Sequence, residues 1–392
     1  MKQYKINEIF EVVSGSTPST SQENYWDGDI KWITPKDLSK LNSAVISDTE
    51  RQITKDGLDS CSTHIIPKDS IIISSRAPIG YVAILGDEMC CNQGCKALVP
   101  TGKIDPYYFF YLLKTKNKQL NDLGTGSTFK ELSKTKLEDF KISVTDIQTQ
   151  NEISTLLIKI DKARQLRKQA NALTDKFLQS TFLSMFGDPA INPKGFQKIE
   201  LKNFYSKKKD GTKCGPFGSA LKKEEYTKNG VPVWVMDNIS NGRFNDKPLL
   251  HITSEKYNQL KSYSVENGDI IISRAGTVGK MCIVESRFPK SIISTNLISL
   301  SLDPDMLLPV YFVTLMTYFA ARVGKLRKGE DGAFTHMNTG ILNNLEIPAP
   351  PIKLQQQFAD IVTETEQLRQ RQRAHEAELD QLFKGLLQKY FG

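Results

Sequence analysis

Residues 146–186 read DIQTQNEISTLLIKIDKARQLRKQANALTDKFLQSTFLSMF, and this run contains neither glycine nor proline. Those two residue types interrupt helices most strongly, so the run predicts one long helix that ends where Gly187-Asp188-Pro189 follows. Thr149 and Glu152 fit a capping box near its start. A helix of about 40 residues would span on the order of 60 Å.

The same features return near the end of the chain at an offset of 205 residues. Ile147-Gln148-Thr149-Gln150 matches Ile352-Lys353-Leu354-Gln355, and Phe186-Gly187 matches Phe391-Gly392. The same offset pairs Phe129 with Phe334, Leu137 with Leu342, Ile142 with Ile347 and Arg164 with Arg369. This period is far longer than that of solenoid repeats, so we expect a duplicated domain pair rather than a stacked array.

The part of each copy that precedes its helix has a mixed pattern. Short β-branched runs at 71–74, 81–85, 270–273 and 292–300 alternate with Gly, Asp and Pro turn signals. One helical stretch follows in each copy, near 107–117 and 310–323. The pattern therefore predicts an α+β class with two similar mixed domains.

Apolar residues in both long helices follow a 4-3 spacing, which is typical of a coiled-coil seam, although several positions are polar. The predicted seam residues are Leu156, Ile160, Ala163, Phe177, Ile361, Leu368, Leu379, Leu382 and Leu386. The first helix leaves domain one and enters domain two, and the second leaves domain two, so the simplest shared seam is antiparallel, with a pseudo-twofold axis. The alternative is two separate amphipathic helices, each lying on its own domain.

The composition restricts the class of protein. The chain has 392 residues, 52 Lys+Arg against 44 Asp+Glu, and a formal charge of +8, which permits a polyanionic partner without requiring one. No apolar run is long enough for a membrane span, and the first residues, Met1 to Lys5, lack the apolar core of a signal peptide. Six cysteines are too few for a disulfide scaffold, so we expect a reducing, cytoplasmic setting.

Motifs of catalysis are missing from the sequence. No Asn/Asp-Pro-Pro-Tyr/Phe segment of amino-methyltransferases occurs, and Ala349-Pro350-Pro351-Ile352 lacks both the amide and the aromatic. No phosphate-binding GxxxxGK[S/T] loop is present. The Cys91 and Cys95 pair has no counterpart in the second copy, so buried reduced thiols are expected rather than a metal site.

Short motifs occur in the same order in both copies. They are Ser14-Gly15-Ser16-Thr17-Pro18-Ser19 with Cys214-Gly215-Pro216-Phe217-Gly218-Ser219, Trp32 with Trp234, strands that end at Arg76 and Arg274, and Gly124-Thr125-Gly126-Ser127-Thr128-Phe129 with Gly332-Ala333-Phe334-Thr335-His336-Met337-Asn338. The two tryptophans are expected to be core residues rather than platforms for stacked bases.

This order, doubled and interleaved with two long helices, resembles the specificity subunit of type I restriction–modification systems over essentially the whole chain. The resemblance implies target-recognition domains at 1–147 and 188–351 and helical spacer regions at 148–187 and 352–392. It implies that each domain reads one half of a bipartite site in double-stranded DNA. It also implies that the chain is not an enzyme, and that it recruits two methyltransferase subunits carrying S-adenosylmethionine and, through them, restriction-translocase subunits.

The two copies also differ. The second lacks the pair Thr17-Pro18, and its basic loop at 207–213 has no match in the first. Different loops imply different half-sites, so an asymmetric target is expected.

Candidate DNA-binding residues are basic, hydroxyl and amide side chains near turn signals. In the first copy they are Lys31, Lys36, Arg76, Lys116, Thr125, Ser127 and Lys130; in the second they are Lys207, Lys208, Lys209, Lys213, Ser219, Lys222, Lys223, Asn238, Arg274, Arg327, Lys328, His336 and Asn338. Lysines suit phosphates, and amides suit the edge of adenine. Arg76 and Arg274 either read bases or tie their loops to carboxylates, and the 207–213 loop either binds phosphates or is merely solvated.

Three classes of function compete. The leading hypothesis is a non-enzymatic, sequence-specific DNA-binding adaptor. The second is an enzyme with a cryptic methyltransferase or nuclease site, and the third is a coiled-coil scaffold that binds only proteins. A steep salt dependence of DNA binding would separate the first from the third, because phosphate contacts release counterions.

Overall fold

The computed structural model divides the chain into two compact units. Unit 1 comprises Met1–Lys168 with Arg373–Gly392, and unit 2 comprises Gln169–Gln372. The described residues are 2–76, 78–102, 104–126, 130–240, 242–274, 278–319 and 337–392.

Unit 1 is built on a five-stranded sheet whose central strand begins with three consecutive isoleucines. Its order is β2 (Phe10–Ser14), β9 (Cys95–Pro100), β6 (Ile71–Ser74), β7 (Val82–Leu85) and β4 (Val45–Ile46). A three-stranded sheet has the order β5 (Gln52–Ile53), β3 (Trp26–Ile33) and β8 (Cys90–Cys91), and β1 (Lys2–Lys5) pairs with β10 (Lys141–Val144). The run Ile71-Ile72-Ile73 is fully buried, as expected for a strand covered on both faces.

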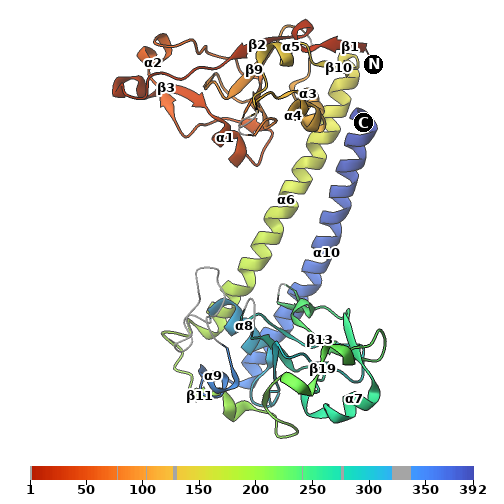
Figure 1. Ribbon diagram of the computed structural model, residues 1–392. Helices are drawn as coiled ribbons and strands as arrows, with labels where there is room; N and C mark the ends of the chain where they lie inside the picture. Colours follow the sequence, from red (N-terminus) through yellow and green to blue (C-terminus); the bar gives the residue numbers. More distant parts are fainter. Residues whose placement is uncertain are drawn as a thin grey trace. The chain divides into compact units, whose positions relative to one another are not determined.

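Short helices complete unit 1: α1 (Pro35–Lys40), α2 (Lys55–Asp59), α3 (Pro106–Thr115), α4 (Asn117–Leu123) and α5 (Lys134–Glu138). Helix α3 is buried from Tyr108 to Leu113 because it is apolar all round. It packs against β7 beside the start of the first long helix (Figure 1). The predicted helical stretch near residue 107 is therefore confirmed.

Unit 2 repeats this arrangement. Its four-stranded sheet has the order β12 (Thr212–Cys214), β20 (Leu297–Leu300), β17 (Ile270–Ser273) and β18 (Met281–Ile283). A three-stranded sheet has the order β16 (Leu250–Ile252), β13 (Val231–Trp234) and β19 (Ile292–Ile293). In addition, β14 (Ile239–Ser240) pairs with β15 (Arg243–Phe244), and β11 (Lys198–Glu200) pairs with β21 (Glu346–Pro348). Its α-helices are α7 (Ser254–Gln259), α8 (Pro309–Phe319) and α9 (Thr339–Asn343). The order β2-β9-β6-β7 recurs as β12-β20-β17-β18, which confirms the duplicated α+β domains.

Two long helices, α6 (Ile147–Phe186) and α10 (Ile352–Phe391), follow the mixed domains, and parts of both belong to each unit. In unit 1, Ile153 and Leu157 near the start of α6 share a core with Phe383 and Phe391 near the end of α10. In unit 2, Phe182 near the end of α6 packs 5.6 Å from Phe358 near the start of α10, measured between ring centroids. Start meets end in both units, so the pairing is antiparallel, and the alternative of two separate helices is wrong.

The predicted seam has the right spacing, but four of its nine positions are wrong. Ile160 is buried, and Ala163, Ile361, Leu379 and Leu386 are half-buried. By contrast, the exposed fractions are 37% for Leu156, 52% for Phe177, 47% for Leu368 and 50% for Leu382. Their neighbours Leu157, Leu178, Arg369 and Phe383 lie on the inner side instead.

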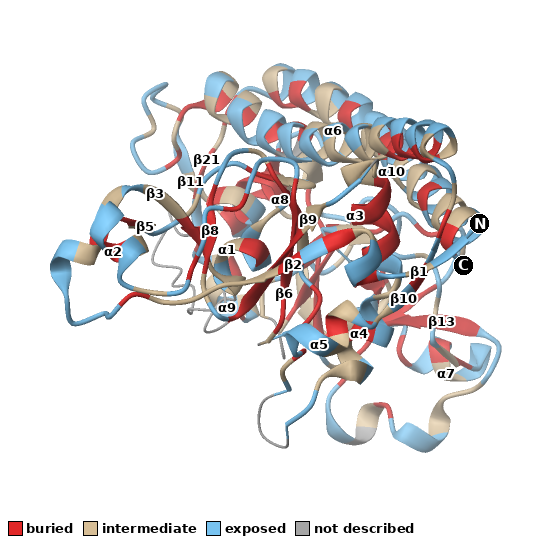
Figure 2. Cartoon of the chain, turned by 90° about the horizontal axis from the view of Figure 1, so that it is seen from above, coloured by how far each residue is buried: buried red, intermediate tan, exposed pale blue. Residues whose placement is uncertain are grey.

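Docking of the helix ends fixes this phase. Phe383 packs 5.8 Å from the Tyr111 ring of α3, and Phe186 packs 4.8 Å from the Tyr311 ring of α8, between ring centroids. Burying an aromatic ring at each helix end stabilises the protein more than burying one further leucine per heptad would. Both helices are therefore rotated so that these rings face the domain cores. Figure 2 shows buried strands in the sheets and much exposed surface on α6 and α10.

The start of α6 is capped by Asp146 and not by the predicted Thr149–Glu152 box. One Asp146 carboxylate oxygen accepts from the Thr149 backbone N–H at 3.0 Å and the other from the Thr149 hydroxyl at 2.8 Å. These bonds lower the pKa of Asp146 to about 2. The cap is thus one residue before the helix, where an aspartate is strongly preferred.

A buried glutamine joins the first turn of each long helix to its domain. Gln150 Oε1 accepts from the Asp105 N–H at 3.1 Å, and its Nε2 donates to the Thr145 carbonyl at 2.8 Å. Gln355, at the equivalent position, accepts from the Leu308 N–H at 2.8 Å and donates to the Pro350 carbonyl at 2.8 Å. The sequence match at these glutamines therefore reflects a shared hydrogen-bonding role.

The paired helices contain polar contacts in both units. In unit 1, Arg164 Nε donates to Asp380 Oδ1 at 2.6 Å, and its guanidinium lies 4.4 Å from the centroid of the Phe383 ring. This bond holds the pKa of Asp380 below its usual range. In unit 2, the buried Thr174 hydroxyl lies 3.3 Å from Gln372 Oε1. Polar groups at a seam specify its register.

We predict that Arg164→Ala lowers the free energy of unfolding by about 1 kcal/mol, because it removes a partly exposed ion pair and a cation–π contact. A double-mutant cycle with Asp380→Asn, in which urea denaturation gives the stability of each variant, measures the coupling between the two side chains. Lys55→Ala is the control, since its side chain is 79% exposed and its amine lies 3.9 Å from Asp59. Equal stability of the Arg164 and Lys55 variants would contradict the packing described here.

Candidate nucleic-acid interface

The repeated motifs gather at one end of the main sheet in each unit. Antiparallel pairing places the end of β2, the start of β9 and the end of β6 side by side, since Ser14 pairs with Lys96 and Ser74 with Cys95. The segment after β2 is held there by the Ser16 N–H, which donates to the Cys91 carbonyl at 3.0 Å. We call this loop cluster the strand-end face of unit 1.

Unit 2 forms the same face from its own loops. The Gly215 N–H donates to the Leu297 carbonyl at 2.9 Å, and the Thr295 hydroxyl donates to the Pro216 carbonyl at 2.6 Å. The Arg274 N–H donates to the Asn296 carbonyl at 2.9 Å, as the Ser75 N–H does to the Gly94 carbonyl at 2.7 Å in unit 1. Loops far apart in sequence are thus fixed together by backbone bonds.

Glycine is required where these loops touch. A Cβ atom on Gly15 would lie 2.1 Å from the Asn92 carbonyl oxygen, and one on Gly215 would lie 1.9 Å from the Ser294 carbonyl oxygen. Both separations are far below van der Waals contact, so only glycine lets the two backbones meet. The glycine-containing motifs at 14–19 and 214–219 therefore position a loop.

The turn after the central strand is also shared. Ser74 Oγ accepts from the Tyr81 N–H at 2.8 Å, and Ser273 Oγ accepts from the Lys280 N–H at 3.0 Å. Gly80 has φ 104° and Gly279 has φ 84°, a backbone region that favours glycine. The backbone frame of the two faces is the same although their side chains differ.

In unit 1 the charges at this face are internally compensated. Arg76 Nη1 lies 3.8 Å from the Glu131 carboxylate. Of the two roles considered for Arg76, this contact favours tying its loop to a carboxylate. Lys96, in β9, is 6% exposed, and burial lowers its pKa while nearby Glu131 opposes the shift. The Thr125 N–H donates to the Glu131 carbonyl at 3.0 Å, and Lys130 is exposed beside it.

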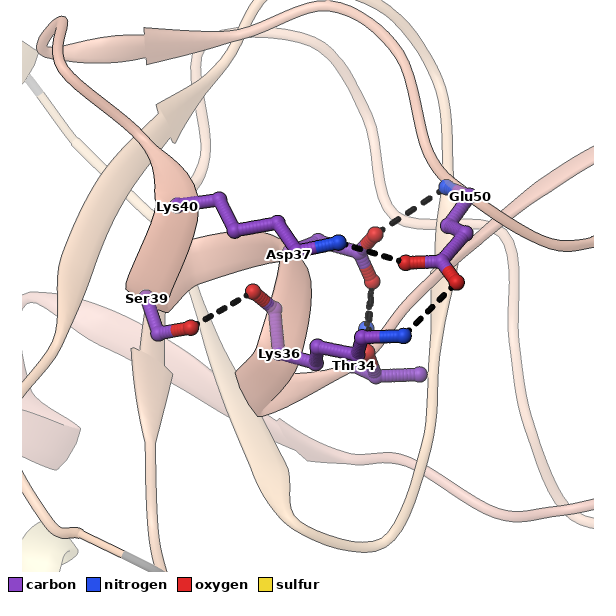
Figure 3. Close-up of polar contacts among 6 residues, drawn as sticks. All are labelled: Thr34, Lys36, Asp37, Ser39, Lys40 and Glu50. Carbon is purple, nitrogen blue, oxygen red and sulfur yellow. Dashed lines mark hydrogen bonds and ion pairs between the residues drawn. The ribbon is translucent and has the colours of Figure 1, made fainter. Parts of the chain in front are cut away.

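Three other candidate lysines of unit 1 have partners within the protein. Lys31 Nζ donates to Asp87 at 2.8 Å, and Lys36 pairs with Glu50 at 2.7 Å beside Lys40 (Figure 3). Lys36 and Lys40 together lower the pKa of Glu50 to about 2. Lys116 Nζ donates to the Phe391 carbonyl at 2.8 Å, so it holds the end of α10.

The basic loop of unit 2 separates into two kinds of lysine. Lys207 and Lys208 are exposed, whereas Lys209 bonds the carboxylate of Asp269. Lys213 pairs with Asp210 at 2.9 Å. The exposed lysines remain candidates for phosphate contacts, as do Lys222 and Lys223, which are exposed at the 3₁₀ turn Lys223–Glu225.

The two candidate asparagines differ. Asn238 is completely buried; its Oδ1 accepts from the Val235 N–H at 2.9 Å and its Nδ2 donates to the Asn245 carbonyl at 2.9 Å. A base edge cannot reach this amide, so the prediction for Asn238 is wrong. Asn338 is exposed and caps α9, its Oδ1 accepting from the Ile341 N–H at 2.9 Å.

Some predicted positions are not described at side-chain level. Ser127, Arg327, Lys328 and His336 lie outside the described residues, and Ser219 lies in the 3₁₀ turn Gly218–Ala220. Trp32 and Trp234 are 3% and 0% exposed, which confirms that they are core residues.

Sequence reasoning overlooked Phe217. Its side chain is 54% exposed in the strand-end face of unit 2, and its ring lies 4.5 Å, at its centroid, from the Arg274 guanidinium. The available signal in the sequence was an aromatic residue among the turn-forming residues Gly215, Pro216 and Gly218.

The chain belongs to the family of the type I restriction modification DNA specificity domain, whose model matches residues 1–174 and 193–379. Both copies of the repeat are thus copies of this domain. Within the described residues, no helix is both long and apolar enough to cross a membrane.

Named relatives are type I specificity subunits. The MjaIX specificity subunit of Methanocaldococcus jannaschii is 41% identical over 186 residues, which cover 47% of this chain and 43% of that protein. The EcoR124I/EcoR124II specificity subunit of Escherichia coli is 29% identical, with 40% of each chain covered. The matches thus span less than half the length of these two relatives. The MjaVIII specificity subunit is 20% identical, with 98% of this chain and 90% of that protein covered.

Solved structures show the same fold. The S subunit of a type I restriction–modification system from M. genitalium superposes with a TM-score of 0.60 at 15% identity, covering all of this chain and 96% of that one.

We predict that Gly15→Ala lowers the free energy of unfolding by about 1–3 kcal/mol, because the new methyl group forces two backbones apart. Gly102→Ala is the matched control in the same unit, since a Cβ there meets nothing within 4 Å. Chemical denaturation measures both variants. Indistinguishable stabilities would show that the loop after β2 is not held against Asn92.

Proposed function

We propose that the chain confers sequence specificity on a type I complex by binding double-stranded DNA, each unit reading one half of an asymmetric bipartite site through its strand-end face. The observation that carries the proposal is one backbone frame, present twice, with different side chains. In unit 1 the frame carries Ser75, Arg76 and Lys96; in unit 2 Arg274 occupies the place of Ser75 and Ile298 that of Lys96. Readers of one fold with unlike contact groups suit unlike half-sites.

The exposed lysines of unit 2 support binding to a polyanion. Lys207, Lys208, Lys222 and Lys223 are exposed, and accessible cations of this kind suit phosphate contacts. In unit 1, Lys130 beside the strand-end face has the same role in this proposal.

The long helices, in this proposal, set the spacer between half-sites and recruit two methyltransferase subunits, which bind S-adenosylmethionine and bring the restriction-translocase subunits. The chain itself is the non-catalytic component. Large apolar side chains exposed on the helices support a protein partner: Leu166 at 55%, Leu173 at 65% and Phe177 at 52% on α6, and Leu368 and Leu382 on α10. Exposed apolar groups of this size favour protein–protein contacts.

We predict that exchanging residues 1–147 for those of another family member changes one half-site only. Each face contains all of its loops within one unit, so the other face keeps its specificity. Mapping methylated adenines in cells that carry the chimaera measures both half-sites. A change in both would end the modular proposal.

We predict that Phe177→Asp weakens assembly with the methyltransferase subunits at least tenfold, because it places a charge where an apolar side chain would be covered. Gln179→Asp adds the same charge at another exposed position of α6 and is the control. Titration of the purified subunits by calorimetry gives both affinities. Equal affinities would show that this side of α6 is not the partner surface.

A further inference from the structure

Arg274 occupies a position that unit 1 fills with a small residue. It follows β17 directly, and its backbone N–H bond to Asn296 matches that of Ser75 to Gly94. Ser75 is completely buried. The sheet frame is unchanged, so the longer arginine side chain extends from the same point into the strand-end face of unit 2.

The guanidinium of Arg274 is held in a defined plane. It lies over the Phe217 ring, 4.5 Å from the ring centroid, and stacking of this kind orients the planar guanidinium group. The loop that carries Phe217 is itself fixed, because the Thr295 hydroxyl donates to the neighbouring Pro216 carbonyl at 2.6 Å. Both halves of the stacked pair are therefore positioned before any ligand binds.

One donor of this group has no acceptor. Arg274 Nη1 is buried without a hydrogen-bond partner in the described part of the chain. Arg76 and Arg164, by contrast, each have a carboxylate neighbour: Arg76 lies near Glu131, and Arg164 bonds Asp380. Nη1 is covered by protein atoms, so a ligand would meet the half-buried guanidinium at its other donors, Nε and Nη2, which also form a planar fork.

We infer that Arg274 reads a guanine in the half-site bound by unit 2, with Phe217 as its support. This inference rests on the proposed function of unit 2. A fixed, planar fork of N–H donors matches the paired acceptors O6 and N7 of guanine in the major groove. Exposed Lys222 and Lys223 in the same unit provide the cations for phosphates, which need no such orientation.

The test uses the assembled complex of this chain with its methyltransferase subunits. Fluorescence anisotropy measures binding to duplexes in which each base pair of both half-sites is replaced in turn. In the wild type, we expect one G·C pair in the half-site of unit 2 whose replacement weakens binding roughly 5- to 150-fold. If that half-site contains no such pair, the inference is overturned.

Arg274→Lys keeps the charge and removes the planar fork, so it should abolish the preference at that one pair and leave other positions unchanged. Arg287→Lys is the matched control in unit 2, because Arg287 is exposed and lies 3.6 Å from Asp246. Phe217→Leu should weaken the same preference while the arginine stays in place, which keeps the test available if Arg274→Lys does not fold.

Three outcomes count against the inference or its basis. If Arg274→Lys binds like the wild type and Arg274→Ala weakens all duplexes equally with a smaller salt slope, Arg274 contacts phosphate and the guanine assignment fails. If Phe217→Leu keeps the full preference, the supporting role of Phe217 fails. If Arg274→Lys loses a base preference in the half-site of unit 1, the modular proposed function fails instead.

Discussion

The direction in which each long helix leaves its domain depends on one buried amide. Gln150 and Gln355 are 2% and 0% exposed, and each accepts from the backbone at the start of the domain helix while donating to the backbone just before its own helix. A buried amide that lost these partners would pay the full cost of desolvation. The first turn of the long helix therefore cannot rotate against α3 or α8 without breaking two bonds.

Each unit is closed by the end of the other long helix. The Phe391 ring packs 5.1 Å from Tyr108 in unit 1, and the Phe186 ring packs 4.8 Å from Tyr311 in unit 2, measured between centroids. The glutamines fix where a helix begins and these aromatic pairs fix where one ends, so the register of the antiparallel pair follows from the domain cores. Thr174 and Gln372 can then occupy the seam as polar residues without loss of register.

The repeat made the fold predictable, because residues that make the same structural contacts are the same in both copies. Gln150 with Gln355 and Phe186 with Phe391 are such pairs. The phase of the seam was not predictable from apolar spacing, since Leu368 and Phe383 support different phases and only the Tyr111 contact decides between them. Local propensity contains no information about such a tertiary contact.

The candidate site shows the same limit more strongly. Net charge and turn signals selected Lys31, Lys36 and Lys116, yet their carboxylate and carbonyl partners lie up to 275 residues away in sequence. Burial likewise removed Asn238, whose amide is bonded to backbone groups of its own segment. A lysine's availability to DNA depends on where carboxylates fold, and sequence spacing does not contain that information.

Under the proposed function, a constant frame with exchangeable side chains would let one fold serve unlike half-sites. The backbone bonds that hold the strand-end face involve carbonyls and N–H groups that every residue except proline has, and only the glycines at 15 and 215 are required for space. Side chains at the Ser75 and Arg274 position can therefore change without moving the loops. Under the same proposal, the specificity of the two copies can diverge while the frame, the glutamine bonds and the aromatic docking of the helices stay the same.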